Sequence, residues 1–438
     1  MNPQPASPAA PEENSAAARL FRTWQIRTLA GAMFGYAAFY FVRKNLSFAM
    51  PAMQTDLGIS KADLGIFLTL HGLLYGVSRF VNGMWADRAN ARYFMVAGLL
   101  LSVGANVFFG FSSTVLLLGV AWMINGWVQG MGFPPCCRLM THWFRPERLA
   151  STMSVWNTSH SIGAALASVA CGYFVLLGWR WCFFGPAILC TAAGIILFIL
   201  LRDTPSSVGL PEIRGDDRPA TAPGPEEKAE HKAFVRRQVF ANPFIWWISL
   251  ANFFVYILRF AVLDWGPTLL KEMKHFPVQQ TGWMVAAFEV SGIIGMLLAG
   301  WLTDRVFGGR GSRTCVFCMI GAGAALTLFW LGAATPAAAT VLLAVAGFFI
   351  YGPQALIGIT AANLATKRAA ATAAGFTGLF GYASTIVSGW GLGVLVEKAG
   401  WHVAFGALLG IGVLGTFMFL LAWRAPAHGY GTANPSSS

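Results

Sequence analysis

Apolar residues run in long stretches along this chain, and polar residues gather in the segments between them. An α-helix needs about 20 apolar residues to cross the roughly 30 Å hydrocarbon core of a bilayer. The sequence offers twelve such stretches. The pattern therefore predicts an all-α membrane protein with twelve transmembrane helices, at residues 28–53, 63–85, 93–112, 114–138, 149–177, 181–202, 243–271, 278–303, 314–334, 337–365, 369–396 and 401–423.

The longest polar segment inside the chain, residues 203–240, divides these stretches six and six. The two halves also repeat: Gly83-Met-Trp-Ala-Asp87-Arg88 and Gly300-Trp-Leu-Thr-Asp304-Arg305 are 217 residues apart, and Arg43 and Arg259 are 216 apart. A duplicated six-helix unit is a transporter architecture, with the binding site where the halves meet. We therefore expect two pseudo-symmetric halves, divided as a cytoplasmic tail (1–27), an N-terminal six-helix bundle (28–202), a cytoplasmic linker (203–240), a C-terminal six-helix bundle (241–425) and a second cytoplasmic tail (426–438).

Composition and charge agree with a membrane protein. Only 11% of the 438 residues are charged, against about a quarter in soluble proteins, which argues against a soluble globular enzyme. The net charge of +12 would indicate a nucleic-acid partner in a soluble protein. Here, with the N-terminus inside, 20 of the 30 Lys and Arg residues fall on the cytoplasmic side and 5 on the other. The bias predicts a multi-pass protein of a bacterial inner (plasma) membrane, with both termini cytoplasmic and no nucleic-acid partner.

Four basic residues lie at membrane depth: Arg43, Lys44, Arg79 and Arg259. A cation there costs about 3 kcal/mol even on the mildest scale, so each needs a partner or a function. The acids available are Asp264 and Glu289, and even if both pair with a base, positive charge remains. Such a surplus favours an anionic ligand, and the planar fork of arginine fits two oxygens of a phosphate group. We interpret Glu289 as an internal partner of a cation rather than a proton carrier.

Neighbours of these cations complete the candidate substrate site. Asn157 and His160 are three residues apart, as are Tyr256 and Arg259, so each pair shares a helical face. His160 could add a donor to phosphate, although a structural hydrogen bond is the alternative. For Tyr256, Tyr351 and Tyr382, packing and binding are equally good interpretations. We expect the repeated loop charges to hold the cytoplasmic gate through contacts at helix ends: Asp87, Arg88, Asp304 and Arg305.

The repeated Gly-x-x-x-Asp-Arg loops resemble the signature of the major facilitator superfamily. Further runs resemble its organophosphate:phosphate antiporters, among them the glycerol-3-phosphate carriers: Tyr40-Phe-Val-Arg-Lys-Asn45, Ser154-Val-Trp-Asn-Thr-Ser-His160, Leu258-Arg-Phe-Ala-Val-Leu-Asp-Trp265 and Ala374-Gly-Phe-Thr-Gly-Leu-Phe-Gly-Tyr382. The resemblance implies a monomeric rocker-switch carrier that exchanges inorganic phosphate for a phosphate ester, with glycerol-3-phosphate the first choice and hexose phosphates next. It also implies that Arg43, Arg259 and His160 bind the phosphate.

Two departures from that family pattern bear on substrate choice. Arg79 stands where the family usually has lysine, and Ser161 and Ala164 replace an Asn and a Gly that tend to follow the histidine. The same family includes sugar-phosphate sensors that act with a membrane histidine kinase, and they keep the arginines, so a sensor is the alternative function. A phosphatase or transferase would need a nucleophile or metal ligands at the membrane ends. We find neither these nor an ATP-binding motif, and the seven cysteines form no metal-ligand pattern. No cofactor or metal is therefore expected.

Overall fold

The computed structural model describes residues 16–86, 88–213 and 225–429. These residues form helices and no strand: α1 (Ala16–Phe41), α2 (Leu46–Leu57), α3 (Lys61–Ala86), α4 (Ala91–Phe111), α5 (Val115–Gln129), α6 (Phe133–Trp143), α7 (Pro146–Phe174), α8 (Trp181–Leu200), α9 (Pro225–Val235), α10 (Pro243–Glu272), α11 (Val278–Arg305), α12 (Gly311–Gly332), α13 (Pro336–Ala383) and α14 (Leu392–Leu421), with a π-helix, η4 (Ile386–Gly391), before α14.

Ten described ranges are long and apolar enough to cross a membrane. One of them, Thr372–Leu421, contains two passes, because the chain reverses at Gly400. The φ of +78° at Gly400 is a left-handed conformation that glycine adopts without a steric penalty. α1 together with α2 forms a further pass. The total is twelve, as the hydrophobic pattern predicts.

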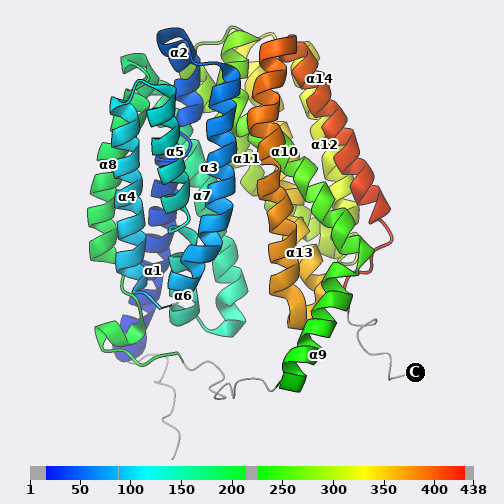
Figure 1. Cartoon of the computed structure of the whole chain (residues 1–438). Coiled ribbons are helices and arrows are strands. Elements are labelled where there is room, and N and C mark those ends of the chain that lie inside the picture. Colours follow the sequence, from blue (N-terminus) through cyan, green and yellow to red (C-terminus); the bar gives the residue numbers. More distant parts are fainter. Residues whose placement is uncertain (1–15, 87, 214–224, 430–438) are drawn as a thin grey trace, which may run out of the picture.

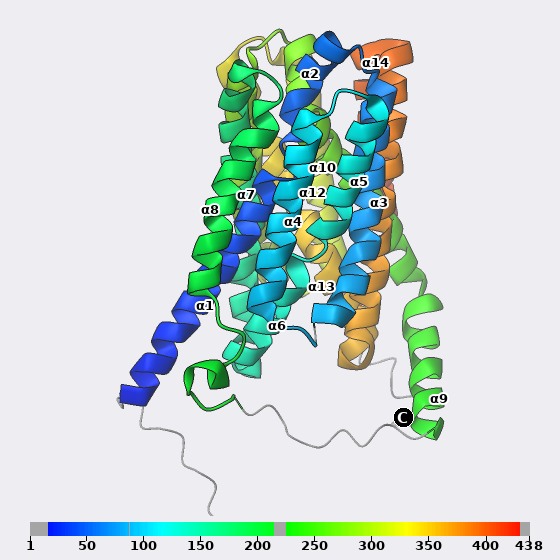
Figure 2. The ribbon, with the colours of Figure 1, turned by 60° about the vertical axis from the view of Figure 1, so that its left-hand side comes forward.

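The twelve passes form two bundles that stand side by side, α1–α8 in one and α10–α14 in the other (Figure 1). The first described residues of α1, the helix α9 and the C-terminal end of the described chain all lie at one end, the lower end in Figures 1 and 2. Asp87, most of the N-terminal tail, the middle of the linker and residues 430–438 lie outside the described residues.

The halves pack most closely at the upper end, where small residues let backbones touch. A Cβ atom added to Gly65 of α3 would lie 2.6 Å from the carbonyl oxygen of Gly389, and one added to Gly282 of α11 would lie 2.6 Å from that of Ser168 on α7. The Thr69 hydroxyl donates to the carbonyl of Thr385 across the same interface, at 2.8 Å. The molecule is thus closed on the side away from its termini.

The unbroken apolar stretch of the first pass predicts one continuous helix, but the structure shows that this pass is interrupted. It breaks between α1 and α2, at residues 42–45. Buried amides satisfy the backbone there: Asn106 of α4 and Asn125 of α5 both donate to the carbonyl of Val42, at 3.0 and 2.8 Å. Asn45 donates to the Asn106 side chain at 2.6 Å. Irregular backbone is tolerated at membrane depth only where neighbours satisfy it in this way, and the break fixes where Arg43 stands.

Candidate functional site

Arg43 projects from this break into a group of tyrosines. Its guanidinium carbon lies 3.9 Å from the ring centroid of Tyr75 and 5.6 Å from that of Tyr40. Tyr36 completes the group one helical turn before Tyr40, with ring centroids 5.7 Å apart. The aromatic faces attract the cation but carry no net negative charge, so the positive charge of Arg43 is stabilised without being neutralised.

Arg79, on α3 of the same half, is held in a similar way. Its guanidinium carbon lies 3.5 Å from the ring centroid of Phe133. One of its nitrogens donates to the hydroxyl of Tyr382 at 3.0 Å, which joins the two halves. Tyr382 also contacts Tyr75 edge to face, with centroids 5.4 Å apart, so Arg43 and Arg79 border one continuous aromatic surface.

Arg259 of α10 is the buried cation of the second half, with 6% of its surface exposed. It donates to the Tyr351 hydroxyl at 3.1 Å, and that hydroxyl in turn donates to Glu289, which is fully buried. The Nε atom of Arg259 and the Oε1 atom of Glu289 are buried with no hydrogen-bond partner among the described residues. Arg259 therefore has unused donor capacity at the interface between the halves.

Lys44 pairs directly with Asp264 across the halves, with Nζ and Oδ1 2.6 Å apart. Both side chains are largely buried, at 11% and 14% exposure. Asp264 lies five residues beyond Arg259 on α10, which runs toward the upper end, so the pair sits above the arginines on the closed side.

His160 of α7 lies between the halves. Its ring is nearly parallel to that of Tyr351, with centroids 6.2 Å apart, and it lies 6.1 Å from Tyr40. Its Nδ1 atom donates to the carbonyl of Asn157, since a carbonyl can only accept. Tyr351 lies beside Arg259, with its ring centroid 4.8 Å from the guanidinium carbon, and Tyr40 lies beside Arg43, at 5.6 Å. The histidine therefore stands where the two arginines converge.

Two of the predicted site residues are less closely engaged. The side chain of Asn157 is exposed, and its contact with His160 is through its backbone. Tyr256 is half-buried, with its ring centroid 5.8 Å from the guanidinium carbon of Arg259. The loop charges lie apart from the site: Arg88, Asp304 and Arg305 are exposed at the lower ends of α3 and α11 and form no ion pair with another described residue. Asp87 lies outside the described residues.

The charges at the site do not cancel. Four cations, namely Arg43, Lys44, Arg79 and Arg259, face two carboxylates, Asp264 and Glu289, and in the described chain no other acid lies at this depth. With both carboxylates ionised, two positive charges remain. Hydrogen-bond donors surround that surplus, an arrangement suited to a doubly charged anion.

Sequence reasoning missed Tyr36, Tyr40 and Tyr75, although a signal for the last two was present. Tyr40 precedes Arg43 by three residues and Tyr75 precedes Arg79 by four, a spacing that predicts one helical face for each pair. The same spacing singles out Tyr256 beside Arg259. Phe133 could not be found in this way, because it reaches Arg79 from another helix.

Comparison with known proteins identifies the family. Residues 32–389 match the profile of the Major Facilitator Superfamily. The chain belongs to this superfamily. Its resemblance to the organophosphate transporters within the superfamily is confirmed by relatives that match over nearly the whole chain, and these relatives are transporters rather than enzymes.

Three relatives show which members of the superfamily this chain resembles. A probable hexose phosphate transport protein of Chlamydia muridarum is 41% identical, with 92% of each chain covered. The glycerol-3-phosphate transporter of Bacillus subtilis is 38% identical, over 92% of this chain and 93% of the relative. The membrane sensor protein UhpC of Escherichia coli is 35% identical, over the same shares. Among solved structures, a bacterial homologue of the lysosomal transporter Spinster has the same fold, with a TM-score of 0.77 at 16% identity, over 95% of this chain and 99% of that one.

Proposed function

We propose that the protein is a secondary antiporter that exchanges inorganic phosphate for a phosphorylated metabolite, with glycerol-3-phosphate as the first candidate and hexose phosphates as the next. The observation that carries this proposal is the surplus of two positive charges at the interface of the halves. A phosphate monoester and inorganic phosphate both carry about two negative charges near neutral pH. Either one would neutralise the surplus.

The division of the arginines between the halves supports obligate exchange. Arg43 and Arg79 belong to one half and Arg259 to the other, and two such charges about 10 Å apart repel by roughly 1.7 kcal/mol at an effective dielectric constant of 20. A dianion between them replaces repulsion by attraction and draws the halves together. In this mechanism the loaded carrier crosses from one state to the other and the empty carrier does not.

The tyrosines near Arg43 are neutral donors beside the arginines, and we assign them the orientation of the phosphate group. His160 already donates its Nδ1 proton to Asn157, and Tyr351 already donates its proton to Glu289. We assign to these two side chains the contacts with the hydroxyls of the organic moiety, from which they would accept. Tyr382 already accepts from Arg79 and would hold it in place. Asn157 and Tyr256 would contribute once the halves approach one another on the lower side. Asp87, Arg88, Asp304 and Arg305 would then hold that side at the helix ends.

We place the lower end of the molecule in the cytoplasm of a bacterial cell, with the protein a monomer in the inner membrane. Residues 203–240 then form a cytoplasmic linker between the bundles 28–202 and 241–425, flanked by the cytoplasmic tails 1–27 and 426–438. The excess of Lys and Arg in the loops at that end supports this orientation. The closed upper side then makes the described state inward-facing.

The proposal is tested by efflux of radiolabelled phosphate from proteoliposomes, with a panel of phosphate esters supplied outside. We expect efflux only when an ester or phosphate is present outside, and its loss in Arg43→Ala. Efflux into plain buffer at the same rate would rule out obligate exchange. The ester that supports the fastest efflux at the lowest concentration identifies the substrate.

The sensor function remains the alternative because a relative of similar identity is named as a membrane sensor. A sensor would bind the ester with the same arginines but would not exchange it for phosphate. Tight ester binding to the purified protein, combined with no efflux from proteoliposomes, would favour the sensor, and a membrane histidine kinase would then be its partner.

A further inference from the structure

Three arginines gather at the lower end of the N-terminal half, away from the central site. They are Arg27 of α1, Arg92 of α4 and Arg202, which follows α8. Arg27 and Arg202 donate to the same oxygen, the carbonyl of Ile199, at 2.8 and 3.1 Å. Two nitrogens that share one acceptor can be no more than about 6 Å apart, so these guanidinium groups are held together by the end of α8.

Aromatic side chains line this arginine cluster. The Trp24 ring centroid lies 4.5 Å from the guanidinium carbon of Arg27 and 5.5 Å from that of Arg202. The guanidinium of Arg92 lies over Phe198, at 3.8 Å. Aromatic residues are typical of the membrane interface, and here they fix the arginines in place while leaving their charges uncompensated.

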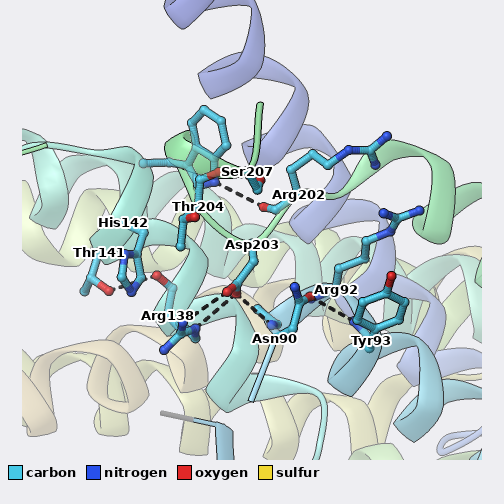
Figure 3. A network of polar contacts seen from close by, with 12 residues as sticks. Asn90, Arg92, Tyr93, Arg138, Thr141, His142, Arg202, Asp203, Thr204 and Ser207 are labelled. Carbon is cyan, nitrogen blue, oxygen red and sulfur yellow. Dashed lines mark hydrogen bonds and ion pairs between the residues drawn. The ribbon is translucent and has the colours of Figure 1, made fainter. Parts of the chain in front are cut away.

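The nearby acid is already engaged. Asp203 forms a two-pronged ion pair with Arg138, at 3.0 Å for each contact, and also accepts from the backbone nitrogen of Ala91 at 2.7 Å. Figure 3 shows this network and shows Arg92 and Arg202 pointing together to one side of it. Neither arginine therefore shares the carboxylate of Asp203, although Asp203 follows Arg202 directly in the chain and contacts the backbone beside Arg92.

The cluster keeps unsatisfied donors and an unfavourable crowding of charge. In the part of the chain that the structure describes, Arg27, Arg92 and Arg202 form no ion pair. The Nε atoms of Arg27 and Arg92 are buried without a hydrogen-bond partner. Burial, together with the neighbouring charges of Arg92 and Arg27, lowers the pKa of Arg202. An anion bound to the accessible parts of the guanidinium groups would compensate this crowded positive charge.

The surroundings indicate an anion that carries a hydrocarbon chain. Exposed apolar side chains flank the cluster on α1 and α8: Ile26 is 62% exposed, Ile199 is 55% and Phe198 is 42%. They are exposed on the outside of the bundle, around the C-terminal end of α8. Basic sites between transmembrane helices on the cytoplasmic side bind lipid headgroups through this combination of charge and apolar surface.

We propose that Arg27, Arg92 and Arg202 form a binding site for the phosphate group of an anionic phospholipid, such as phosphatidylglycerol or cardiolipin, in the leaflet next to the termini. The arginines hold the headgroup phosphate, and the apolar residues of α1 and α8 contact its acyl chains. A bound lipid would join α1, α4 and α8. This site is separate from the central arginines and does not depend on the proposed transport activity.

Native mass spectrometry of the full-length protein, released from micelles that contain phosphatidylglycerol, cardiolipin or phosphatidylcholine, tests the site. We expect wild type to retain the two anionic lipids at least tenfold more readily than phosphatidylcholine. Arg92→Gln/Arg202→Gln should lose one retained anionic lipid. The matched control, Arg236→Gln/Arg237→Gln, removes the same charge from exposed arginines before α10 and should retain lipid as wild type does.

Three results would overturn the proposal: equal retention of anionic and neutral lipids by wild type, equal loss in the test and control variants, or displacement of the lipid by millimolar inorganic phosphate. The last would assign the cluster to free phosphate instead. If the double variant does not fold, Arg92→Gln alone serves as the test, because Arg92 forms no hydrogen bond from its side chain to a described residue. A melting temperature within a few degrees of wild type confirms that a variant has folded.

Discussion

The Lys44–Asp264 pair allows a sharp test of the charge arrangement. Removing one member, in Lys44→Met or Asp264→Asn, leaves the other uncompensated in a site where each side chain is less than 15% exposed. Breaking a buried pair in this way costs about 3–5 kcal/mol. Lys44→Met also reduces the positive surplus at the site from two to one, and Asp264→Asn raises it to three.

Because the pair joins the halves on the closed side, its loss destabilises the described state, which is closed at the upper end. A cost of about 3 kcal/mol shifts a two-state equilibrium by roughly a hundredfold, and we expect phosphate exchange in proteoliposomes to slow by a similar factor in each single variant. The double variant Lys44→Met/Asp264→Asn restores the surplus of two and leaves no unpaired charge. Its exchange rate should return to within about tenfold of wild type, since uncharged replacements for a buried pair are often tolerated.

Initial exchange rates for the four members of this cycle, with melting temperatures in detergent as a control for folding, provide the measurement. The reasoning is refuted if the double variant is slower than either single variant. It is equally refuted if Lys44→Met exchanges at the wild-type rate.

Three further substitutions test other parts of the structure. Tyr351→Phe removes the hydroxyl that joins Arg259 to Glu289. We expect the affinity for the ester, measured by isothermal titration, to fall about tenfold, which is the equivalent of one charged hydrogen bond of about 1.5 kcal/mol. An unchanged affinity would show that the hydroxyl is not needed. Asn106→Leu removes hydrogen-bond donors and an acceptor at the break after α1. We expect it to lower the melting temperature by several degrees and to weaken phosphate binding. An unaltered melting curve would contradict the role of Asn106 in stabilising the break. Gly282→Val adds a side chain at a position where a Cβ atom would lie 2.6 Å from the backbone of α7. We expect this variant to lose exchange while it still binds the ester. Exchange at the wild-type rate would contradict the close packing of the halves.

Much of the fold follows from local sequence. Twelve apolar stretches and a polar centre are enough to predict the number of helices and the six-plus-six division, because a membrane span must satisfy its own backbone. The break at residues 42–45 does not follow, since its stability depends on Asn106 and Asn125, which approach from other helices. A local pattern carries no information about such distant partners.

The candidate site divides in the same way. Arg43, Arg79 and Arg259 stand out because a buried charge in an apolar stretch is costly, and the two acids stand out for the same reason. Which acid meets which base depends on how the halves pack: Asp264 meets Lys44 directly, whereas Glu289 reaches Arg259 through the hydroxyl of Tyr351. Only the structure supplies these pairings.

The central claim is that two uncompensated positive charges select a doubly charged phosphate. The most direct test is competition for bound radiolabelled phosphate at pH 7.5 between glycerol-3-phosphate and its methyl diester, which differs mainly by carrying one charge less. At about 6 Å and an effective dielectric constant of 20, one charge pair contributes roughly 2.8 kcal/mol, so we expect the diester to compete about a hundredfold more weakly. Equal competition by the two compounds would contradict the account.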